Sequence, residues 1–132
     1  MPLYRSSKNR REWIHVDDHC RGVEAVLSKG LPGQTYNIGT GVEVDIETIA
    51  DSILSILGLD AQYKEYVQDR PGHDRRYLLD SKKITEQLGW SPQITFNEGL
   101  REVVRWYQKN EAWWKPLLKR EAIAEDHWNT FV

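Results

Sequence analysis

The segment from residue 45 to residue 58 carries the most regular pattern in the chain. Its apolar residues recur at spacings of three and four, which places them on one helical face: Ile46, Ile49, Ala50, Ile53, Leu54 and Leu57. Asp45 precedes this stripe as a helix N-cap, and Gly58 follows it as a terminal glycine. The pattern therefore predicts an amphipathic helix with both ends defined.

Three further helices are predicted by polar caps and terminal glycines. Their expected limits are Asp17 or Asp18 to Gly30, Asp80 or Ser81 to Gly89, and Thr95 to about residue 107. Thr95 and Glu98 form a capping box, in which each side chain bonds the other residue's backbone N–H. From about residue 111 the chain is charged and aromatic, which predicts one more helical segment.

Short aromatic and β-branched runs lie between these helices and predict strands. The expected strands are residues 13–16, 35–38, 63–67 and 77–79, whereas the polar residues 1–11 are expected to form a loop. The alternation predicts a small α/β domain, α+β-like in its organisation, with short strands and about five helices. At 132 residues the chain corresponds to one small domain.

Charge and cysteine content exclude several classes of protein. The formal net charge is −2, so the basic balance that a nucleic-acid-binding protein needs is absent. The single cysteine, Cys20, allows no intrachain disulfide and favours a reducing compartment, so we expect a cytoplasmic protein. The N-terminal residues lack the apolar region of a secretory signal, and no stretch approaches the roughly 18 apolar residues of a membrane span.

Two motifs of cofactor chemistry are incomplete. Gly39-Thr40-Gly41 begins a G-x-G-x-x-G pattern, but Val44 stands where the third glycine should be, so no NAD fingerprint is present. Tyr4 and Lys8 match a Tyr-x-x-x-Lys pair, which works only when both side chains share a helical face. Because this segment has no helical periodicity, we assign no catalytic and no cofactor-binding residue.

Two histidines, two aspartates and the cysteine crowd into residues 15–20 and suggest a metal site: His15, Asp17, Asp18, His19 and Cys20. His15 falls in an expected strand and His19 in an expected helix, so their side chains need not converge, and no metal site is predicted. Cys20 could be an activated nucleophile near a helix N-terminus. The favoured interpretation is a small buried residue on the inner face of that helix.

Aromatic residues gather in the last quarter of the chain: Trp106, Tyr107, Trp113, Trp114 and Trp128. They fit either a helical end that packs within the domain or a surface that meets another domain or subunit.

Cationic side chains recur in the expected loops and at the ends of expected elements: Arg10, Arg11, Arg70, His73, Arg75 and Arg76. A diphosphate requires fixed cationic forks, which arginine supplies in bidentate form. In the turn 69–73, Pro71 fixes φ and Gly72 permits close backbone approach, so the turn can present Arg70 and His73 to an anion. A solvated loop whose arginines pair with neighbouring aspartates remains the alternative.

Five segments resemble the extended short-chain dehydrogenase/reductases that act on nucleotide sugars. They are R-E-W-I-H-V-D-D at 11–18, Y-N-I-G at 36–39, D-R-P-G-H-D-R-R-Y at 69–77, L-G-W-S-P at 88–92 and F-N-E-G-L at 96–100. The segment 69–77 is typical of the dTDP-glucose 4,6-dehydratases, whereas 36–39 and 88–92 are shared across the superfamily. At position 5 this chain has Arg5 where the family has a glycine.

The resemblance implies that residues 1–115 are a substrate-binding, C-terminal domain and that residues 116–132 are a tail, expected to be helical. It implies substrate binding by Arg11 at the diphosphate, by Asn37, and by a loop that closes on the nucleotide. That loop comprises Asp69, Arg70, Pro71, Gly72 and His73, with Arg70 as the phosphate ligand. It further implies that the catalytic residues and the NAD site belong to an N-terminal Rossmann half, and that the family enzyme is a homodimer acting on a dTDP-sugar.

Two other functions remain open at this point. One is a part of another nucleotide-sugar epimerase or decarboxylase, against which the 69–74 run argues. The other is a non-catalytic binding or assembly module, which the incomplete cofactor fingerprint supports.

Overall fold

The structure is a computed structural model that describes residues 1–119. Its elements in chain order are β1 (Pro2–Tyr4), β2 (Arg10–Glu12), α1 (Val16–Lys29), β3 (Glu43–Asp45), α2 (Ile46–Leu57), the 3₁₀ helix η1 (Ala61–Tyr63), β4 (Glu65–Val67), α3 (Lys82–Leu88), α4 (Phe96–Lys109), α5 (Glu111–Trp114) and the 3₁₀ helix η2 (Lys115–Lys119). The expected helical tail is thus seen only as far as η2, and its remainder, with Trp128, lies outside the described residues.

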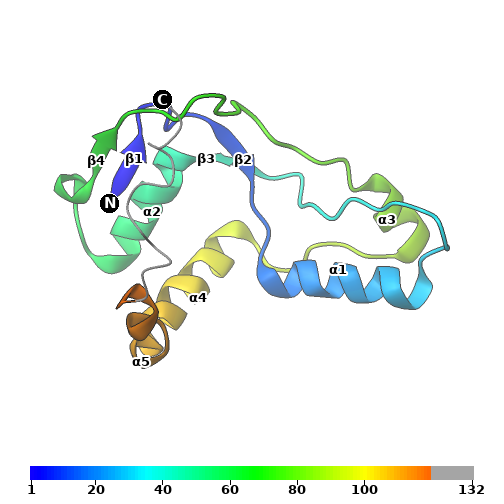
Figure 1. The fold of residues 1–132 in the computed structure, drawn as a ribbon. Helices are drawn as coiled ribbons and strands as arrows, with labels where there is room; N and C mark the ends of the chain where they lie inside the picture. The colour runs from blue at the N-terminus through cyan, green and yellow to red at the C-terminus, as the bar shows by residue number, and fades with distance from the viewer. Residues whose placement is uncertain (120–132) are drawn as a thin grey trace.

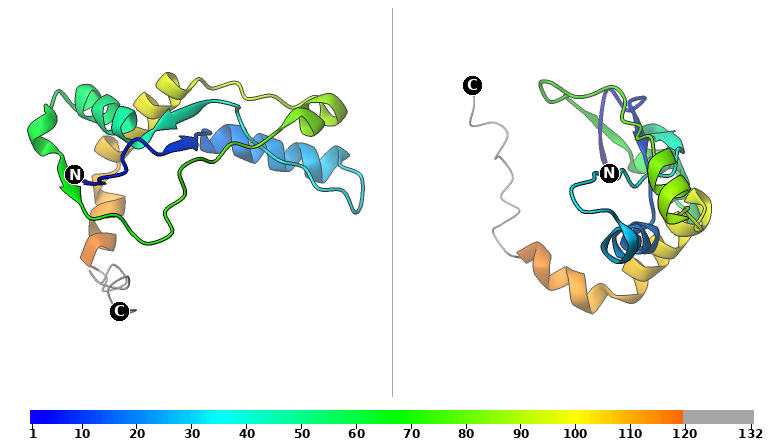
Figure 2. Two further views of the ribbon diagram at one scale, coloured as in Figure 1. Left: turned by 90° about the horizontal axis from the view of Figure 1, so that it is seen from above. Right: turned by 90° about the vertical axis from the view of Figure 1, so that its right-hand side faces the viewer.

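The described elements gather at two ends of an elongated molecule (Figure 1). Helices α2, α4 and α5 lie with β1 and β4 at one end, and helices α1 and α3 lie at the other. Connecting segments that include residues 30–42 and 68–81 run between the ends, and the views in Figure 2 show the 68–81 connection as an arc beside the rest of the chain. The predicted mixed domain of short strands and five α-helices is confirmed.

Two small sheets hold the connections in place. β1 pairs in parallel with β4, with Leu3 opposite Tyr66, and β2 pairs antiparallel to β3, with Arg11 opposite Val44. A single bridge joins Arg10 to Arg76. These pairings bring the loop that precedes residue 76 next to β1 and β2, although more than 60 residues separate them in the sequence.

Each end of the molecule has its own apolar core. At the α1–α3 end, Ile84, Leu88 and Trp90 are buried, and Val26 and Ile38 pack against them. At the other end the buried residues come from β1, α2 and α4: Leu3, Ile49, Ala50, Leu54 and Val104. The apolar stripe of α2 therefore faces a core as its spacing predicts.

The ends of α2 and α4 agree with their sequence signals. The Asp45 carboxylate accepts the Thr48 backbone N–H at 2.9 Å, and Gly58 adopts the left-handed conformation with φ of 69°. The capping box of Thr95 and Glu98 is formed. Of the two expected caps of α3, Ser81 makes no side-chain cap bond, whereas the Asp80 carboxylate accepts the Lys82 backbone N–H at 2.9 Å.

Asp18 is a fully buried carboxylate rather than a helix cap. The cap of α1 is His15, whose Nδ1 accepts the Asp17 backbone N–H at 3.3 Å. Asp18 accepts the backbone N–H groups of Gln93 and Ile94 at 2.8 and 2.9 Å and also pairs with Arg21. Burial raises the pKa of Asp18, but these hydrogen bonds and the Arg21 charge outweigh it and lower the pKa below its usual value.

Several strand predictions are wrong. Residues 13–16, 35–38 and 77–79 form no strand, and the expected strand 63–67 begins as η1 and is a strand only over Glu65–Val67. A strand needs a neighbouring ladder, and within residues 1–119 these segments make isolated bonds instead, such as that from the Trp13 indole to the Val44 carbonyl at 3.2 Å. Conversely, the expected loop 1–11 contains β1 and β2, because both find partner strands.

The exposure of Cys20 and of the apolar residues of α1 also differs from expectation. Cys20 is exposed, because the buried side of the helix is set by Asp18 and Gly22, and a residue midway between them points the other way. Val23 and Leu27 remain 49% and 86% exposed, so the apolar stripe of α1 is largely uncovered by the described residues. Among those residues, no helix has the length and apolar character needed to cross a bilayer.

An ion-pair network around Glu47 predicts acid sensitivity. Lys64 Nζ lies 2.6 Å from both the Glu47 and Asp51 carboxylates, and the Tyr66 hydroxyl also donates to Glu47. The Lys64 hydrogen bond, with those of Ser7 and Tyr66, lowers the pKa of Glu47 from 4.5 to about 2. Because the folded pKa is depressed, the stabilisation is present above pH 4.5 and is lost as the pH falls toward 2.

We therefore expect Glu47→Gln to reduce the acid dependence of stability in that window, as measured by urea unfolding between pH 6 and pH 2.5. Glu65→Gln is the matched control, because Glu65 is exposed on β4. An unchanged acid slope in Glu47→Gln would contradict the assignment.

Candidate functional site

The predicted loop 69–73 lies against the turn that follows β1. Ser6 donates its backbone N–H and its hydroxyl to the Asp69 carboxylate at 2.9 and 2.7 Å. The Ser6 Oγ also lies 3.1 Å from His73 Nδ1, and the Tyr4 ring meets the His73 ring edge-on at 5.1 Å. Asp69 and His73, the two ends of this loop, are therefore held in place, whereas Arg70 between them is exposed.

Arg11 reaches the same loop from β2. Its Nη2 donates to the Asp74 carbonyl at 2.6 Å, and its guanidinium lies over the Tyr77 ring at 4.9 Å. The Tyr77 hydroxyl donates to the Asp74 carboxylate and lowers the pKa of that group, and the charges of Arg11 and Arg70 lower it further. The charges of Arg11, on β2, and of Arg70, in the 69–73 loop, thus both act on the Asp74 carboxyl.

Asn37 occupies an adjoining position on the extended segment 35–38. Its side-chain amide donates to the Asp80 carbonyl at 3.2 Å, which places this segment beside the end of the 68–81 connection. Glu12 ties the two segments together, because its carboxylate accepts the backbone N–H groups of Gly41 and Leu79. A Cβ on Gly39 would lie 2.7 Å from the Glu12 oxygens, which explains the glycine of the Y-N-I-G segment.

Two of the scattered arginines are occupied by structural contacts. Arg76 binds the Glu43 carboxylate with two hydrogen bonds of 2.6 and 2.9 Å, and Arg10 donates to the Glu43 carbonyl. The hydrogen bonds from Arg76 are the main cause that lowers the pKa of Glu43, and the charges of Arg76 and Arg10 lower it further. Across residues 1–119 no ion pair within 4 Å joins an arginine to Asp69, Asp74 or Asp80, although the charges of Arg11 and Arg70 lower the pKa of Asp74.

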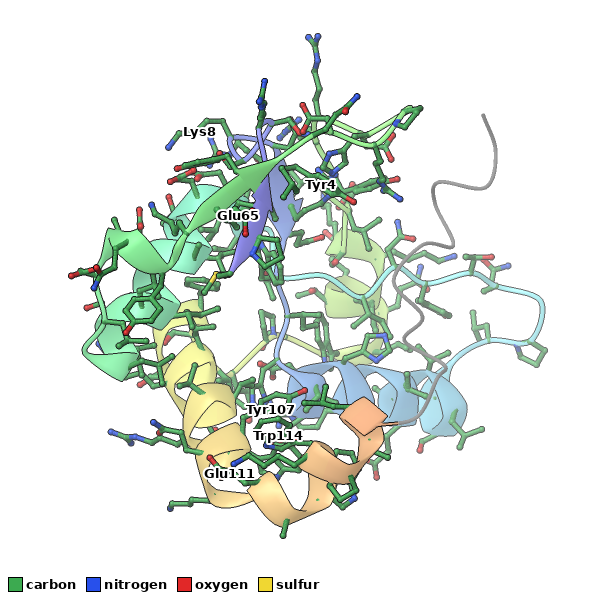
Figure 3. All side chains as sticks on the ribbon, turned by 60° about the vertical axis from the view of Figure 1, so that its left-hand side comes forward. Tyr4, Lys8, Glu65, Tyr107, Glu111 and Trp114 are labelled. Carbon is green, nitrogen blue, oxygen red and sulfur yellow. The ribbon has the colours of Figure 1, made fainter. Side chains whose placement is uncertain are left out.

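The Tyr4–Lys8 pair has no catalytic geometry. Tyr4 ends β1, whereas Lys8 lies in the following turn and pairs with Asp45 at 3.9 Å with its side chain 77% exposed. Figure 3 shows the two side chains at separate places on this surface. The same view shows Tyr107 and Trp114 together, where the Trp114 indole donates to the Tyr107 carbonyl at 2.8 Å. Trp106, Tyr107 and Trp113 nevertheless remain exposed.

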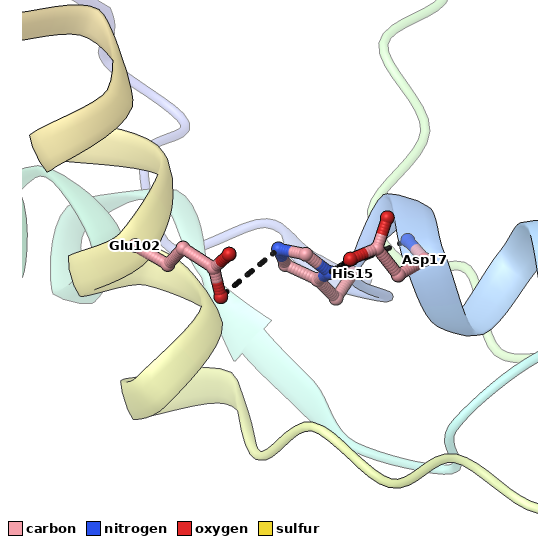
Figure 4. Close-up of side chains that lie close together, drawn as sticks. All are labelled: His15, Asp17 and Glu102. Atoms are coloured by element: carbon pink, nitrogen blue, oxygen red, sulfur yellow. Dashed lines mark hydrogen bonds and ion pairs between the residues drawn. The ribbon is translucent and has the colours of Figure 1, made fainter. Parts of the chain in front are cut away.

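His15 lies between two carboxylates that come from different helices (Figure 4). Its Nδ1 is 3.8 Å from Asp17 and its Nε2 is 3.9 Å from Glu102. One ligand atom from each of the three residues lies within 4.8 Å of the others. The two carboxylates nevertheless face different ring nitrogens, and Nδ1 already accepts the Asp17 backbone N–H. The His15 ring packs on Gly99, where a Cβ would lie 3.0 Å from the ring, so we interpret His15 as a packing residue between α1 and α4.

Surface hollows in the described part of the chain lie away from the predicted site. A hollow of about 410 Å³ is lined by residues of both α2 and α4, and one of about 790 Å³ runs along α4. A third, of about 340 Å³, lies between α1 and residues 88–93. None of the three is lined by the seven predicted residues. Of these seven, Asn37, Asp69, Arg70, Pro71 and Gly72 are exposed, and Arg11 and His73 are half-buried.

The short paired strands and five α-helices have the fold of a C-terminal lobe of the extended short-chain dehydrogenase/reductase class. Solved structures of that class match this fold with TM-scores up to 0.86. The chain belongs to the family described as GDP-mannose 4,6 dehydratase, whose family model matches residues 2–103.

Several relatives of this chain are dTDP-glucose 4,6-dehydratases. A dTDP-glucose 4,6-dehydratase of Streptomyces niveus is 47% identical over 117 residues, which cover 89% of this chain and 35% of that protein. A crystal structure of DesIV, a dTDP-glucose 4,6-dehydratase from Streptomyces venezuelae with NAD and TYD bound, matches with 47% identity and a TM-score of 0.86, covering 89% of this chain and 36% of that one.

A more distant match is the UDP-glucose 4-epimerase of Thermotoga maritima with UDP-glucose, at 29% identity and a TM-score of 0.78. It covers 84% of this chain and 35% of that one. The chain therefore spans about a third of the length of the relatives it matches.

Proposed function

We propose that this chain is the nucleotide-sugar-binding part of a dTDP-glucose 4,6-dehydratase. The observation that carries the proposal is that Arg11 donates to the Asp74 carbonyl at 2.6 Å, while the charges of Arg11 and Arg70 both lower the pKa of the Asp74 carboxyl. Two guanidinium groups that act on the same anionic group would supply the paired forks that a diphosphate requires. The identity of 47% with dTDP-glucose 4,6-dehydratases supports this choice over an epimerase, for which the identity is 29%.

In this proposal the chain binds and orients the substrate. Arg11 and Arg70 hold the two phosphates, Asn37 contacts the sugar nucleotide, and the loop Asp69–His73 closes on the nucleotide. The lyase reaction removes water from dTDP-glucose, and NAD accepts and returns the hydride when it is bound in the whole enzyme. The catalytic residues and the NAD site belong to the part of the relatives that this chain does not match, so we expect no turnover by these 132 residues alone.

The exposed apolar stripe of α1 is the proposed contact with that part. Val16, Val23, Leu27 and Leu31 are between 49% and 86% exposed. Exposed apolar surface of this extent marks an interaction site. The unmatched two thirds of the relatives, a Rossmann half in the proposal, is the partner that would cover it.

Nucleotide binding tests the proposal directly through thermal stability, because a ligand that binds only the folded state raises Tm. We expect millimolar dTDP to raise the Tm of the chain, UDP to raise it less, and NAD to leave it unchanged. The affinity should be weak, because family residues outside this chain hold part of the thymine end.

Each outcome of this scan decides between the functions. An equal response to dTDP and UDP favours the epimerase alternative. A shift with NAD contradicts the placement of the cofactor site. If a mixture with a Rossmann half of a relative also gives no shift with dTDP, the proposal fails in favour of a non-catalytic module.

A further inference from the structure

Ser6 stands at the meeting point of the two ends of the 69–73 loop. Its hydroxyl lies 2.7 Å from Asp69 Oδ1 and 3.1 Å from His73 Nδ1, and its backbone N–H also donates to Asp69. A serine hydroxyl carries one proton, so it can donate to only one of these two neighbours. Which neighbour receives the proton decides the state of the histidine ring.

The charge on Asp69 decides this question. The backbone N–H of Ser6, then its hydroxyl, and then the charges of His73 and Arg5 lower the pKa of Asp69. Asp69 is therefore a carboxylate at neutral pH and can only accept hydrogen bonds. A hydroxyl that donates to a carboxylate makes the stronger, charge-assisted bond. If the proton pointed to His73 instead, two oxygens would face each other at 2.7 Å without a hydrogen between them.

We propose that Ser6 is a positioning residue that keeps the proton of His73 on Nδ1 and so leaves Nε2 to meet the ligand. Ser6 accepts the Nδ1–H of His73 while it donates to Asp69, and the Tyr4 ring restrains the imidazole from the side at 5.1 Å. Neutral His73 then offers Nε2 as an acceptor for a ligand hydroxyl, and protonated His73 offers it as a donor to a phosphate oxygen. The ligand side of this inference rests on the function proposed above, whereas the state of the ring does not.

The ring state is measurable without ligand by two-dimensional ¹H–¹⁵N NMR of the chain labelled at its four histidines. The His73 signals are assigned with His73→Gln. Above the titration of the ring, wild type should show a protonated Nδ1 and an unprotonated Nε2. Ser6→Ala should move the proton to Nε2, and Ser6→Thr, which keeps a hydroxyl, should restore the wild-type pattern. Ser28→Ala, at an exposed serine of α1, is the matched control.

A wild-type ring protonated on Nε2 overturns the inference, as does a Ser6→Ala pattern that equals wild type. The wild-type spectrum alone decides the first point, even if Ser6→Ala does not fold. Ser6→Ala should also weaken dTDP binding by roughly threefold to tenfold, the effect of one lost hydrogen bond. If the ring states are as expected but dTDP leaves the His73 signals unchanged even with a Rossmann half of a relative added, the proposed function fails and the role of Ser6 in positioning the ring stands.

Discussion

Asp18→Asn should cost the fold about 3–5 kcal/mol, the usual effect of removing one partner of a buried ion pair, because the Asp18 carboxylate is fully buried although Arg21 is 35% exposed. The Gln93 and Ile94 backbone N–H groups bind the two separate oxygens of Asp18, so the asparagine NH₂ would face one of them without an acceptor, and Arg21 would lose its charge partner. The Trp90 indole donates to the backbone carbonyl of residue 18 at 3.1 Å, a bond that the variant retains. Because domains of this size are stable by only about 5–15 kcal/mol, the variant should be partly unfolded at 37 °C.

Urea unfolding followed by tryptophan fluorescence and circular dichroism measures this loss. Glu24→Gln is the control, because it removes a carboxylate from an exposed position of the same helix. A loss below about 1 kcal/mol, the range of exposed ion pairs, would show that Asp18 does not hold the 90–95 connection to α1.

The role of Asp18 also shows what the sequence could not reveal. An aspartate at a helix start usually caps the helix, and no local pattern distinguishes that role from a bond to a loop more than 70 residues away. Helix ends that depend on neighbouring residues were predictable, as at Asp45, Gly58 and Thr95. The sequence wrongly predicted strands at 13–16 and 35–38, because a strand exists only where another segment pairs with it, and such pairing is not visible in the local sequence.

The sequence likewise predicted some residues of the candidate site and missed others. The members of this site were proposed from motifs and from the affinity of arginine for phosphate, and the charges of Arg11 and Arg70 both act on the Asp74 carboxyl. Sequence reasoning missed Ser6, Glu12 and Asp74, whose bonds join segments that lie far apart in the chain. Glu12 belongs to the R-E-W-I-H-V-D-D segment at 11–18, which could have indicated it, whereas nothing near Ser6 in the sequence indicates its contact with Asp69.

Arg70→Ala should separate binding from folding. Arg70 is exposed, and no hydrogen bond or ion pair holds its side chain among residues 1–119, so stability should change by less than about 0.5 kcal/mol. If the guanidinium binds a phosphate, its loss should weaken dTDP binding by roughly 10- to 100-fold, the range of a lost charge-assisted hydrogen bond. Arg70→Lys should recover only part of this, because an ammonium lacks the planar fork.

Arg11→Ala should weaken binding similarly, and also reduce stability, because Arg11 packs on Tyr77 and bonds the Asp74 carbonyl. Two arginines on one diphosphate should not act independently, so the double variant should lose less binding free energy than the sum of the single variants. Calorimetric titration with dTDP measures all of these, with Arg105→Ala on α4 as the control. Unchanged dTDP affinity in Arg70→Ala would remove the phosphate site from this loop, since no structural role of Arg70 could hide the loss.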